Sequence, residues 1–321
     1  MKPLRFLAQA LLLAGAILST QAQGTIVFVT NTVIGQWDFD TAQLQTATVG
    51  QPLQFIGFTP TATTAPINGR SAGVMSLPAT SAAERILATF APTNNGTGTN
   101  LNQYTIIMDV MWPAESEGTW RALFNTDTSN TNDAEIFVNP DGSTGIFNNY
   151  AGNMLSDTWY RLALVFDLTT NSLTRYLNGV NAAGTNAGAM SLGAEGNVDG
   201  RFSLNRSLLF FSDNDGETAP GFVNVIQLRA GAMTDAEVAA LGGPGSNGLG
   251  EGGEPVGDVE ILTIKRVDNN VVLTFSPGRQ VQLQRSASLV NPNWANEGLP
   301  VMNTATVPIT GNIGFFRVQV L

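Results

Sequence analysis

Apolar and polar residues alternate along much of this chain. In residues 104–112 (YTIIMDVMW) and 160–167 (YRLALVFD), every second side chain is large and apolar. A period of two is typical of a β-strand with one buried face. A polar turn at residues 169–172 follows the second run and leads into a further alternating run at 173–177. The last two runs therefore predict a β-hairpin.

Helix signals are rare. Thr234 and Glu237 stand in the relation of a capping box, and Gly242 follows the apolar residues of that segment, which predicts one short helix. Ser81 and Glu84 form a similar pair, but the residues after them also suit a strand, so we expect a single turn leading into a strand. Many short strands with glycine and asparagine turns, and almost no helix, predict an all-β sandwich of antiparallel sheets.

The first 23 residues have the layout of a secretory signal peptide. Lys2 and Arg5 precede an apolar run at residues 6–18, and small and polar residues follow it. The run is shorter than the roughly 20 apolar residues of a membrane span, and no later stretch approaches that length. We therefore expect an exported protein, either secreted or at the cell surface, that does not insert into a membrane.

A glycine-rich stretch divides the rest of the chain. Residues 244–258 (PGSNGLGEGGEPVGD) contain no apolar run and predict a flexible linker. The linker separates a large domain, residues 24–243, from a small C-terminal domain, residues 259–321. About six short strands predict a small β-sandwich-like domain there, and we expect no functional site in it. Its runs VQLQRSASLVNPNW and GFFRVQV resemble small β-domains appended to secreted bacterial proteins, which implies an accessory role in sorting, attachment or spacing.

The composition excludes several kinds of chemistry. The chain has no cysteine and no histidine, and its only lysines are Lys2 and Lys265. A thiol nucleophile, a Ser–His pair and a histidine-ligated zinc or iron site are therefore excluded. With 15 basic and 25 acidic residues, the net charge is −10. Such a surface repels nucleic acid and anionic membranes and suits divalent cations or neutral ligands such as glycans, although acidity can also serve only to keep an exported protein soluble.

Four segments together resemble a known family: GQWDFD (35–40), TWYRLALVFD (158–167), YLNGV (176–180) and VIQLRAGAMTDAEVAALGG (225–243). In this order they resemble the laminin G-like, concanavalin A-like jelly rolls of secreted bacterial proteins, over residues 24–243. The resemblance implies two antiparallel sheets packed face to face, a binding region on the concave sheet or its rim loops, and often a calcium ion at the rim. The family includes glycan-binding modules, protein-binding modules and some glycoside hydrolases, so the resemblance does not decide the activity.

A glycoside hydrolase normally needs two facing carboxylates, about 5 to 5.5 Å apart for retention and farther apart for inversion. The glucanases of this fold present theirs from one strand as Glu-x-Asp-x-Glu or Glu-x-Asp-x-x-Glu, and no such run occurs in this sequence. The nearest acidic pairs are Glu115 with Glu117 and Asp38 with Asp40, which we expect to be solvated loop charge. The sequence therefore predicts no catalytic residue and a protein that is not an enzyme.

An acidic turn is the candidate metal site. In FFSDNDGET (210–218), Asp213, Asp215 and Glu217 offer carboxylate oxygens at alternate positions around Gly216. Calcium takes six to eight oxygen ligands and tolerates irregular loops, so these residues suit it. Asp-Gly and Asn-Asp pairs are also ordinary turn formers. The two alternatives are a calcium site and a plain chain reversal.

A second polar loop, residues 125–135 (NTDTSNTNDAE), supplies the candidate ligand-binding residues Asp127, Asn130 and Asp133. Amide and carboxylate groups orient sugar hydroxyls, and the loop would complete one site with Asp213 if both lie at the same rim. The alternative is a long hydrophilic hairpin loop.

Two tryptophans and three arginines are further candidates for the ligand site. Trp120 and Trp159 could stack on sugar rings, but their place in alternating segments favours the core. Arg121, Arg161 and Arg201 are expected to pair with acids at the sheet surface rather than to act in catalysis.

These observations favour a secreted, non-catalytic binding protein. Its jelly roll would recognise an extracellular glycan or a cell-surface polymer, with calcium as a candidate cofactor. The alternatives are an adhesive or structural surface protein that binds other proteins, and a divergent glycoside hydrolase.

Overall fold

The computed structural model describes residues 32–91, 94–184 and 186–249, and the segments 261–267, 270–275, 281–286, 295–299, 301, 304–308 and 315–320. The chain divides into two compact units, Met1–Pro255 and Val256–Leu321, and each is described by itself. The expected signal peptide and residues 250–258 of the expected linker lie outside the described residues. Among the described residues, no helix has the length and the apolar character that crossing a membrane requires.

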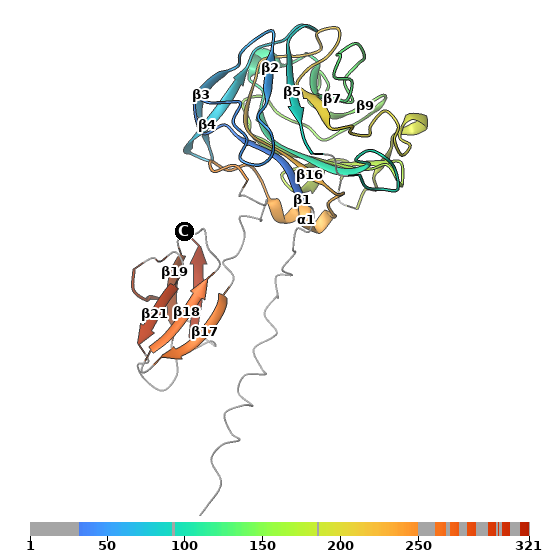
Figure 1. Ribbon diagram of the computed structural model, residues 1–321. Coiled ribbons are helices and arrows are strands. Elements are labelled where there is room, and N and C mark those ends of the chain that lie inside the picture. Colours follow the sequence, from blue (N-terminus) through green and yellow to red (C-terminus); the bar gives the residue numbers. More distant parts are fainter. Residues whose placement is uncertain are drawn as a thin grey trace, which may run out of the picture. The chain divides into compact units, whose positions relative to one another are not determined.

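The larger sheet of the first unit has nine antiparallel strands (Figure 1). They are β1 (Thr32–Asp38), β3 (Thr61–Ile67), β4 (Arg70–Leu77), β6 (Gln103–Met111), β11 (Tyr160–Asp167), β12 (Ser172–Leu177), β13 (Val180–Asn181), β14 (Met190–Ser191) and β16 (Gly221–Ala230). Their order is β13-β12-β11-β6-β16-β4-β3, with β1 paired to β16 and β14 paired to β12. The predicted hairpin is β11 and β12, which pair from Leu162 with Leu177 to Asp167 with Ser172.

The smaller sheet has seven strands. They are β2 (Gln54–Ile56), β5 (Arg85–Thr89), β7 (Arg121–Asn125), β8 (Ile136–Val138), β9 (Thr144–Ile146), β10 (Asn149–Ala151) and β15 (Ser207–Phe210). Their order is β10-β9-β8-β7-β15-β5-β2. The chain passes from this sheet to the larger one between β5 and β6 and again between β15 and β16, so the unit is a two-sheet, jelly-roll-like sandwich. The predicted all-β class is confirmed.

The core lies between the two sheets and is rich in aromatic rings. The Trp37 ring is fully buried and meets Phe210 edge to face, with 5.8 Å between ring centroids. Phe166 stacks on Tyr104 at 4.6 Å and meets Phe124 edge to face at 5.6 Å. Such contacts between rings add to the free energy of burial. The strands that supply these rings are therefore held in a fixed position relative to one another.

The two predicted capping signals form the expected structures. Helix α1 (Asp235–Leu241) begins after Thr234, and the Thr234 and Glu237 side chains each accept a hydrogen bond from the other residue's backbone N–H. Gly242 ends the helix with a positive φ of 61°, which costs glycine little. Ser81 and Glu84 close a single turn, in which the Glu84 N–H donates to the Ser81 carbonyl at 2.9 Å, and β5 follows at once.

The outer face of the nine-stranded sheet, turned away from the core, is covered. Helix α1 contacts β13, and its Val238 and Leu241 belong to one buried cluster with Val225 and Val165 of the sheet. Leu249 belongs to the same buried cluster.

Residues 244–249 therefore do not belong to a flexible linker, contrary to the sequence-based expectation. Their backbone carbonyls accept hydrogen bonds from side chains of the first unit: the exposed Asn68 donates to Pro244, and the buried Arg161 and Gln36 donate to Gly248 and Leu249. Glycine-rich composition does not prevent ordered packing where buried donors need acceptors.

A buried ion pair lies under this cover. Two guanidinium nitrogens of Arg161 each donate to a carboxylate oxygen of Asp109 at 2.7 Å, and both side chains are almost fully buried. Arg161 also donates to the last carbonyl of α1, Leu241 O, at 2.6 Å. The expected pairing of Arg161 with an acid is confirmed, and the pair ties the helix to the sheet.

The second unit has two three-stranded antiparallel sheets. One contains β17 (Ile261–Val267), β18 (Asn270–Phe275) and β21 (Thr304–Pro308), and the other β19 (Val281–Ser286), β20 (Ala295–Asn296) and β22 (Phe315–Val320). Leu273, Leu283, Ala305 and Val307 are buried. These six strands agree with the number expected from the sequence.

Candidate functional site

An open cavity of about 210 Å³ lies on the outer face of the seven-stranded sheet. Its lining residues are Trp120, Asp133, Ala134, Phe137, Ile146, Phe147, Tyr150, Arg201 and Glu217. Typical ligand pockets measure roughly 300–1,000 Å³, so this one suits a single unit of a larger ligand. A hollow of about 10 Å³ beside Trp112 and Arg121 has room for little more than one water molecule.

Strand alternation places the aromatic wall of the cavity. In β8, Ile136 and Val138 belong to the core between the sheets, whereas Phe137 points to the opposite face. Trp120 and Tyr150 pack against the same outer cluster and are only partly buried. Phe137 itself is buried, so the apolar surface left partly exposed at the cavity comes from Trp120 and Tyr150 packed over it.

The expectation that both tryptophans belong to the core was wrong. Trp120 belongs to the outward row of Ala122, and Trp159 has the parity of the outward-facing Ala163 and Val165, so both tryptophans lie outside the inward rows and remain partly exposed. Trp120 lines the cavity and Trp159 does not. The signal that could have identified Trp120 is its place immediately after Gly118 and Thr119, where the alternation of the strand has not yet begun.

Two carboxylates complete the cavity wall, Asp133 and Glu217. Among the described residues, neither carboxylate takes part in a hydrogen bond or ion pair, and Asp133 is exposed. Partial burial raises the pKa of Glu217, and the negative charges of Asp215, Asp213 and Asp133 raise it further. The cavity thus offers hydrogen-bond acceptors that a ligand can use.

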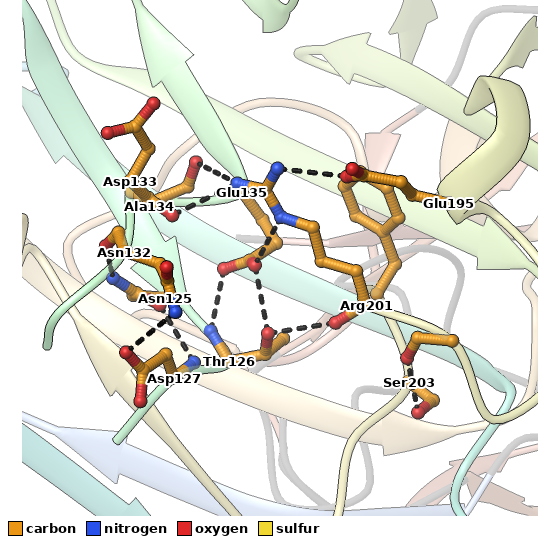
Figure 2. Close-up of polar contacts among 12 residues, drawn as sticks. Asn125, Thr126, Asp127, Asn132, Asp133, Ala134, Glu135, Glu195, Arg201 and Ser203 are labelled. Atoms are coloured by element: carbon orange, nitrogen blue, oxygen red, sulfur yellow. Dashed lines mark hydrogen bonds and ion pairs between the residues drawn. The ribbon is translucent and has the colours of Figure 1, made fainter. Parts of the chain in front are cut away.

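Arg201 closes another side of the cavity and is held by two acids (Figure 2). Its guanidinium donates to Glu135 at 3.1 Å and to Glu195 at 3.0 Å, and also to the backbone carbonyls of Asp133 and Ala134. Figure 2 shows the Asp133 carboxylate pointing away from this guanidinium. The expected pairing of Arg201 with acids is confirmed.

Glu135 lies behind Arg201 and is almost fully buried. Its carboxylate accepts from the Thr126 N–H at 2.6 Å and from the Thr126 hydroxyl at 2.9 Å. Burial raises the pKa of Glu135 to about 7, although Thr126 and Arg201 favour the charged form. Sequence reasoning placed Glu135 in the polar loop but assigned it no role, because its contact with Arg201 spans 66 positions of the chain.

The expectation that Arg121 pairs with an acid was wrong. Its guanidinium donates to the Asn139 carbonyl and lies over the Trp112 ring, 5.7 Å from the centroid. This places it beside the small hollow rather than in the larger cavity.

Of the three predicted ligand-binding residues, only Asp133 lines the cavity. The Asp127 carboxylate accepts from the backbone N–H groups of Ser129 and Thr131, at 3.0 and 2.8 Å, and so shapes its own loop. Asn130 is buried, and its side-chain amide donates to Ala82 O and Asp213 O. The polar atoms of Asp127 and Asn130 therefore form hydrogen bonds within the protein. These two residues stabilise the loop and do not line the cavity.

The predicted metal residues lie together at the same rim. One carboxylate oxygen from each of Asp213, Asp215 and Glu217 lies within 4.8 Å of the others. Asp213 is buried, and its oxygens accept from the backbone N–H groups of Ala134, Asp215 and Glu217 at 3.0 to 3.3 Å. Asp213 thus stabilises the turn. It also joins the turn to the loop at 125–135, through the Ala134 N–H and the Asn130 side chain, so the two predicted segments do lie together.

A second position presents oxygen atoms with unmet hydrogen-bonding capacity. Asp38 Oδ1 and Asn224 Oδ1 are buried and have no hydrogen-bond partner among the described residues. A Cβ atom added to Gly248 would lie 3.2 Å from the first and 3.6 Å from the second, so both oxygens border the same backbone. Adjacent acceptors without donors fit an oxygen-preferring cation such as Ca²⁺.

The expectation that Asp38 is a solvated charge in a loop was wrong. It ends β1 and is partly buried, and its other oxygen accepts from Gln36 at 2.9 Å and Thr48 at 2.6 Å. Asp40 is exposed, and its pKa is raised by partial burial and by the charge of Asp38. Glu115 and Glu117 are exposed, as expected.

Neither a protein-family model nor a curated protein matches this chain. Solved structures with a similar arrangement of strands include domain 4 of AbnA, a GH43 extracellular arabinanase from Geobacillus stearothermophilus in complex with arabinotriose. It has 19% sequence identity and a TM-score of 0.42, and the match covers 65% of this chain and 97% of that chain. The receptor-binding domain of botulinum neurotoxin D has 11% identity and a TM-score of 0.44, over 88% and 80% of the two chains.

Trypanosoma rangeli sialidase in complex with sialic acid has 8% identity and a TM-score of 0.45, over 64% of this chain and 32% of that one. The class stated here, an all-β jelly-roll-like sandwich, follows from the two antiparallel sheets of this chain itself.

Proposed function

We propose that the protein is a secreted glycan-binding protein that holds one unit of its ligand in the cavity on the seven-stranded sheet. The observation that carries this proposal is the pair of partly exposed rings of Trp120 and Tyr150, packed against the buried Phe137, beside the carboxylates of Asp133 and Glu217, which have no partner among the described residues. Aromatic faces pack on the apolar faces of sugar rings, and carboxylates accept hydrogen bonds from sugar hydroxyls.

Binding without catalysis is the form of this proposal that the residues favour. A general acid or a nucleophile is usually oriented by neighbouring hydrogen bonds, and no described residue orients Asp133 or Glu217 in this way. Glu135, whose pKa is raised to about 7, lies behind Arg201 and does not line the cavity.

The finer family assignment is also part of the proposal. The segments that resemble laminin G-like, concanavalin A-like domains occupy β1, β11, β12, β16 and α1, and the capped helix after the last strand is where that resemblance expects it. The small second unit serves this protein as an accessory domain for attachment or spacing at the cell surface.

Calcium is proposed as a structural cofactor. The three carboxylates of the acidic turn lie close enough to share one ion. The pair formed by Asp38 and Asn224 has stronger support, because its two oxygens lack donors, whereas the Asp213 oxygens already accept three backbone N–H groups.

The test is a binding assay with the mature chain, residues 24–321, on a panel of extracellular polysaccharides. We expect Trp120→Ala to weaken binding at least tenfold, because removal of a central aromatic contact typically costs about 2 kcal/mol or more. Trp159→Ala is the matched control, since Trp159 is also partly exposed but lies outside the cavity. Equal binding by both variants, or no binding to any polysaccharide, would contradict the proposal. Release of reducing ends would instead establish a hydrolase, and co-purification with envelope proteins without glycan affinity would establish the adhesive alternative.

A further inference from the structure

The rings in the cavity do not form a flat platform. The Trp120 ring is inclined by 83° to Phe137 and by 63° to Tyr150, with centroids 5.8 and 5.7 Å apart. Rings in edge-to-face contact present surfaces of different orientation, so the partly exposed rings of Trp120 and Tyr150 can contact two different groups of one ligand. One of these groups can be an ammonium group, which an aromatic face attracts by a cation–π interaction.

The charges at the cavity favour a cation as well. Asp133 and Glu217 line it, and one carboxylate oxygen from each of Asp213 and Asp215 lies within 4.8 Å of a Glu217 carboxylate oxygen. Arg201, the base among the lining residues, is already paired with two acids, Glu135 and Glu195.

No ammonium group of the protein itself lies in the described part of the first unit. The sequence contains lysine only at Lys2 and Lys265, and the first precedes the described residues while the second belongs to the second unit. The positive charge of Arg175 lowers the pKa of Tyr150, but its guanidinium already donates to Thr144 O, Asn149 O and the Asn149 side chain. The two carboxylates at the cavity therefore have no compensating cation of their own.

We propose that the cavity selects glycans that carry protonated amino groups, such as glucosamine units, over neutral and acidic glycans. The inference rests on the proposed function and specifies its ligand class. The sugar ring packs on the aromatic wall, and its ammonium group lies between the ring faces and the carboxylates of Asp133 and Glu217. Acidic sugars are disfavoured because like charges repel at short range in a partly desolvated cavity.

The experiment compares glucosamine oligomers with N-acetylglucosamine oligomers of the same length, by calorimetric titration of the mature chain at pH 6 in EDTA. EDTA is included because Ca²⁺ at the acidic turn would neutralise Glu217. We expect the glucosamine oligomers to bind at least about tenfold more tightly, an advantage that decreases as salt concentration rises.

Three charge-neutralising variants give the matched comparison. Glu217→Gln and Asp133→Asn should each weaken glucosamine binding about fivefold to tenfold and leave N-acetylglucosamine binding within about twofold. Glu115→Gln, which removes an exposed carboxylate away from the cavity, should change neither affinity. Circular dichroism melts of all three variants establish that each is folded before its affinity is compared.

The outcomes separate this inference from the proposed function. If both oligomers bind equally and Glu217→Gln has no effect, while Trp120→Ala weakens both, the selection for amino groups is overturned and glycan binding stands. If no glycan binds, both proposals fail. If choline or free lysine binds as tightly as the glucosamine oligomer, the cavity recognises an ammonium group without the sugar, and the assignment to amino sugars is wrong.

Discussion

The two sheets of the first unit carry outward-facing apolar residues, but only one of these outer faces is covered. On the nine-stranded sheet, Val165 and Val225 are buried by helix α1 and by Leu249. On the seven-stranded sheet, Trp120 and Tyr150 stay partly exposed around an open cavity. An apolar face that the chain covers contributes to stability, whereas an apolar face left open is where the proposed ligand site lies.

The polar groups of the two faces follow the same division. Asp109 on the covered face accepts two hydrogen bonds from Arg161, and the pair is shielded from water. Asp133 and Glu217 on the open face are without such partners among the described residues. Substitutions on the covered face should therefore change stability, and substitutions on the open face should change binding.

The largest effect is expected for Asp109→Ala. It leaves the buried Arg161 guanidinium without its carboxylate, which typically costs about 3–5 kcal/mol of unfolding free energy. Urea denaturation of the mature chain measures the loss, and Glu115→Ala is the exposed-acid control. A loss below about 1 kcal/mol would mean that the cover over this sheet does not exclude water.

The next effect is a pH dependence that comes from Glu135, on the open side. Its pKa is raised to about 7 in the folded protein, above the usual glutamate value near 4.3 in the unfolded chain. Between these values the folded state holds more protons than the unfolded state, so the free energy of unfolding falls as pH rises from about 4.5 to 7.

The expected fall is a few kcal/mol, and Glu135→Gln should flatten this part of the profile. Unfolding free energies from pH 4 to 8 measure it, with Glu117→Gln as the control. A wild-type profile that rises over this range, or an unchanged profile in Glu135→Gln, would show that Glu135 is charged at neutral pH.

The third prediction separates binding from stability on the open face. Tyr150→Ala should weaken ligand binding by roughly 1–2 kcal/mol, about fivefold to thirtyfold, because its ring lines the cavity that is proposed to hold the ligand. The melting temperature should change by only a few degrees, since the ring is already partly exposed. A large loss of stability without a loss of affinity would place Tyr150 with the structural residues and weaken the contrast between the faces.

The smallest effect is calcium stabilisation. At ten times the dissociation constant, one ion adds about 1.4 kcal/mol, which raises the melting temperature by a few degrees. Melts in EDTA and in calcium up to millimolar concentration should show this shift, and Asp38→Asn should remove it. If Glu217→Gln removes the shift and Asp38→Asn does not, the acidic turn holds the ion instead.

The local pattern was sufficient for the fold class. Period-two alternation identified β6, β11 and β12, and the capping box identified α1, because strand and cap signals depend on residues a few positions apart. The same local signals predicted that Asp213, Asp215 and Glu217 surround one turn. The prediction of a flexible linker was wrong for residues 244–249, because composition does not show which side chains of other strands donate hydrogen bonds to them.

The site itself was decided by tertiary structure. The sequence shows Trp120, Glu135 and Arg201 as unrelated residues, and only the pairing of strands and the packing of loops brings Trp120 and Arg201 to one cavity and Glu135 behind Arg201. Which tryptophan faces solvent depends on where each strand begins, and which acid is free depends on which backbone N–H groups fold toward it. Secondary structure was therefore determined by short-range patterns. The roles of the loop acids and amides depended instead on contacts between segments and on hydrogen bonds within the loops, which no pattern of apolar and polar residues encodes. This holds for Asp127, Asn130, Asp133 and Asp213.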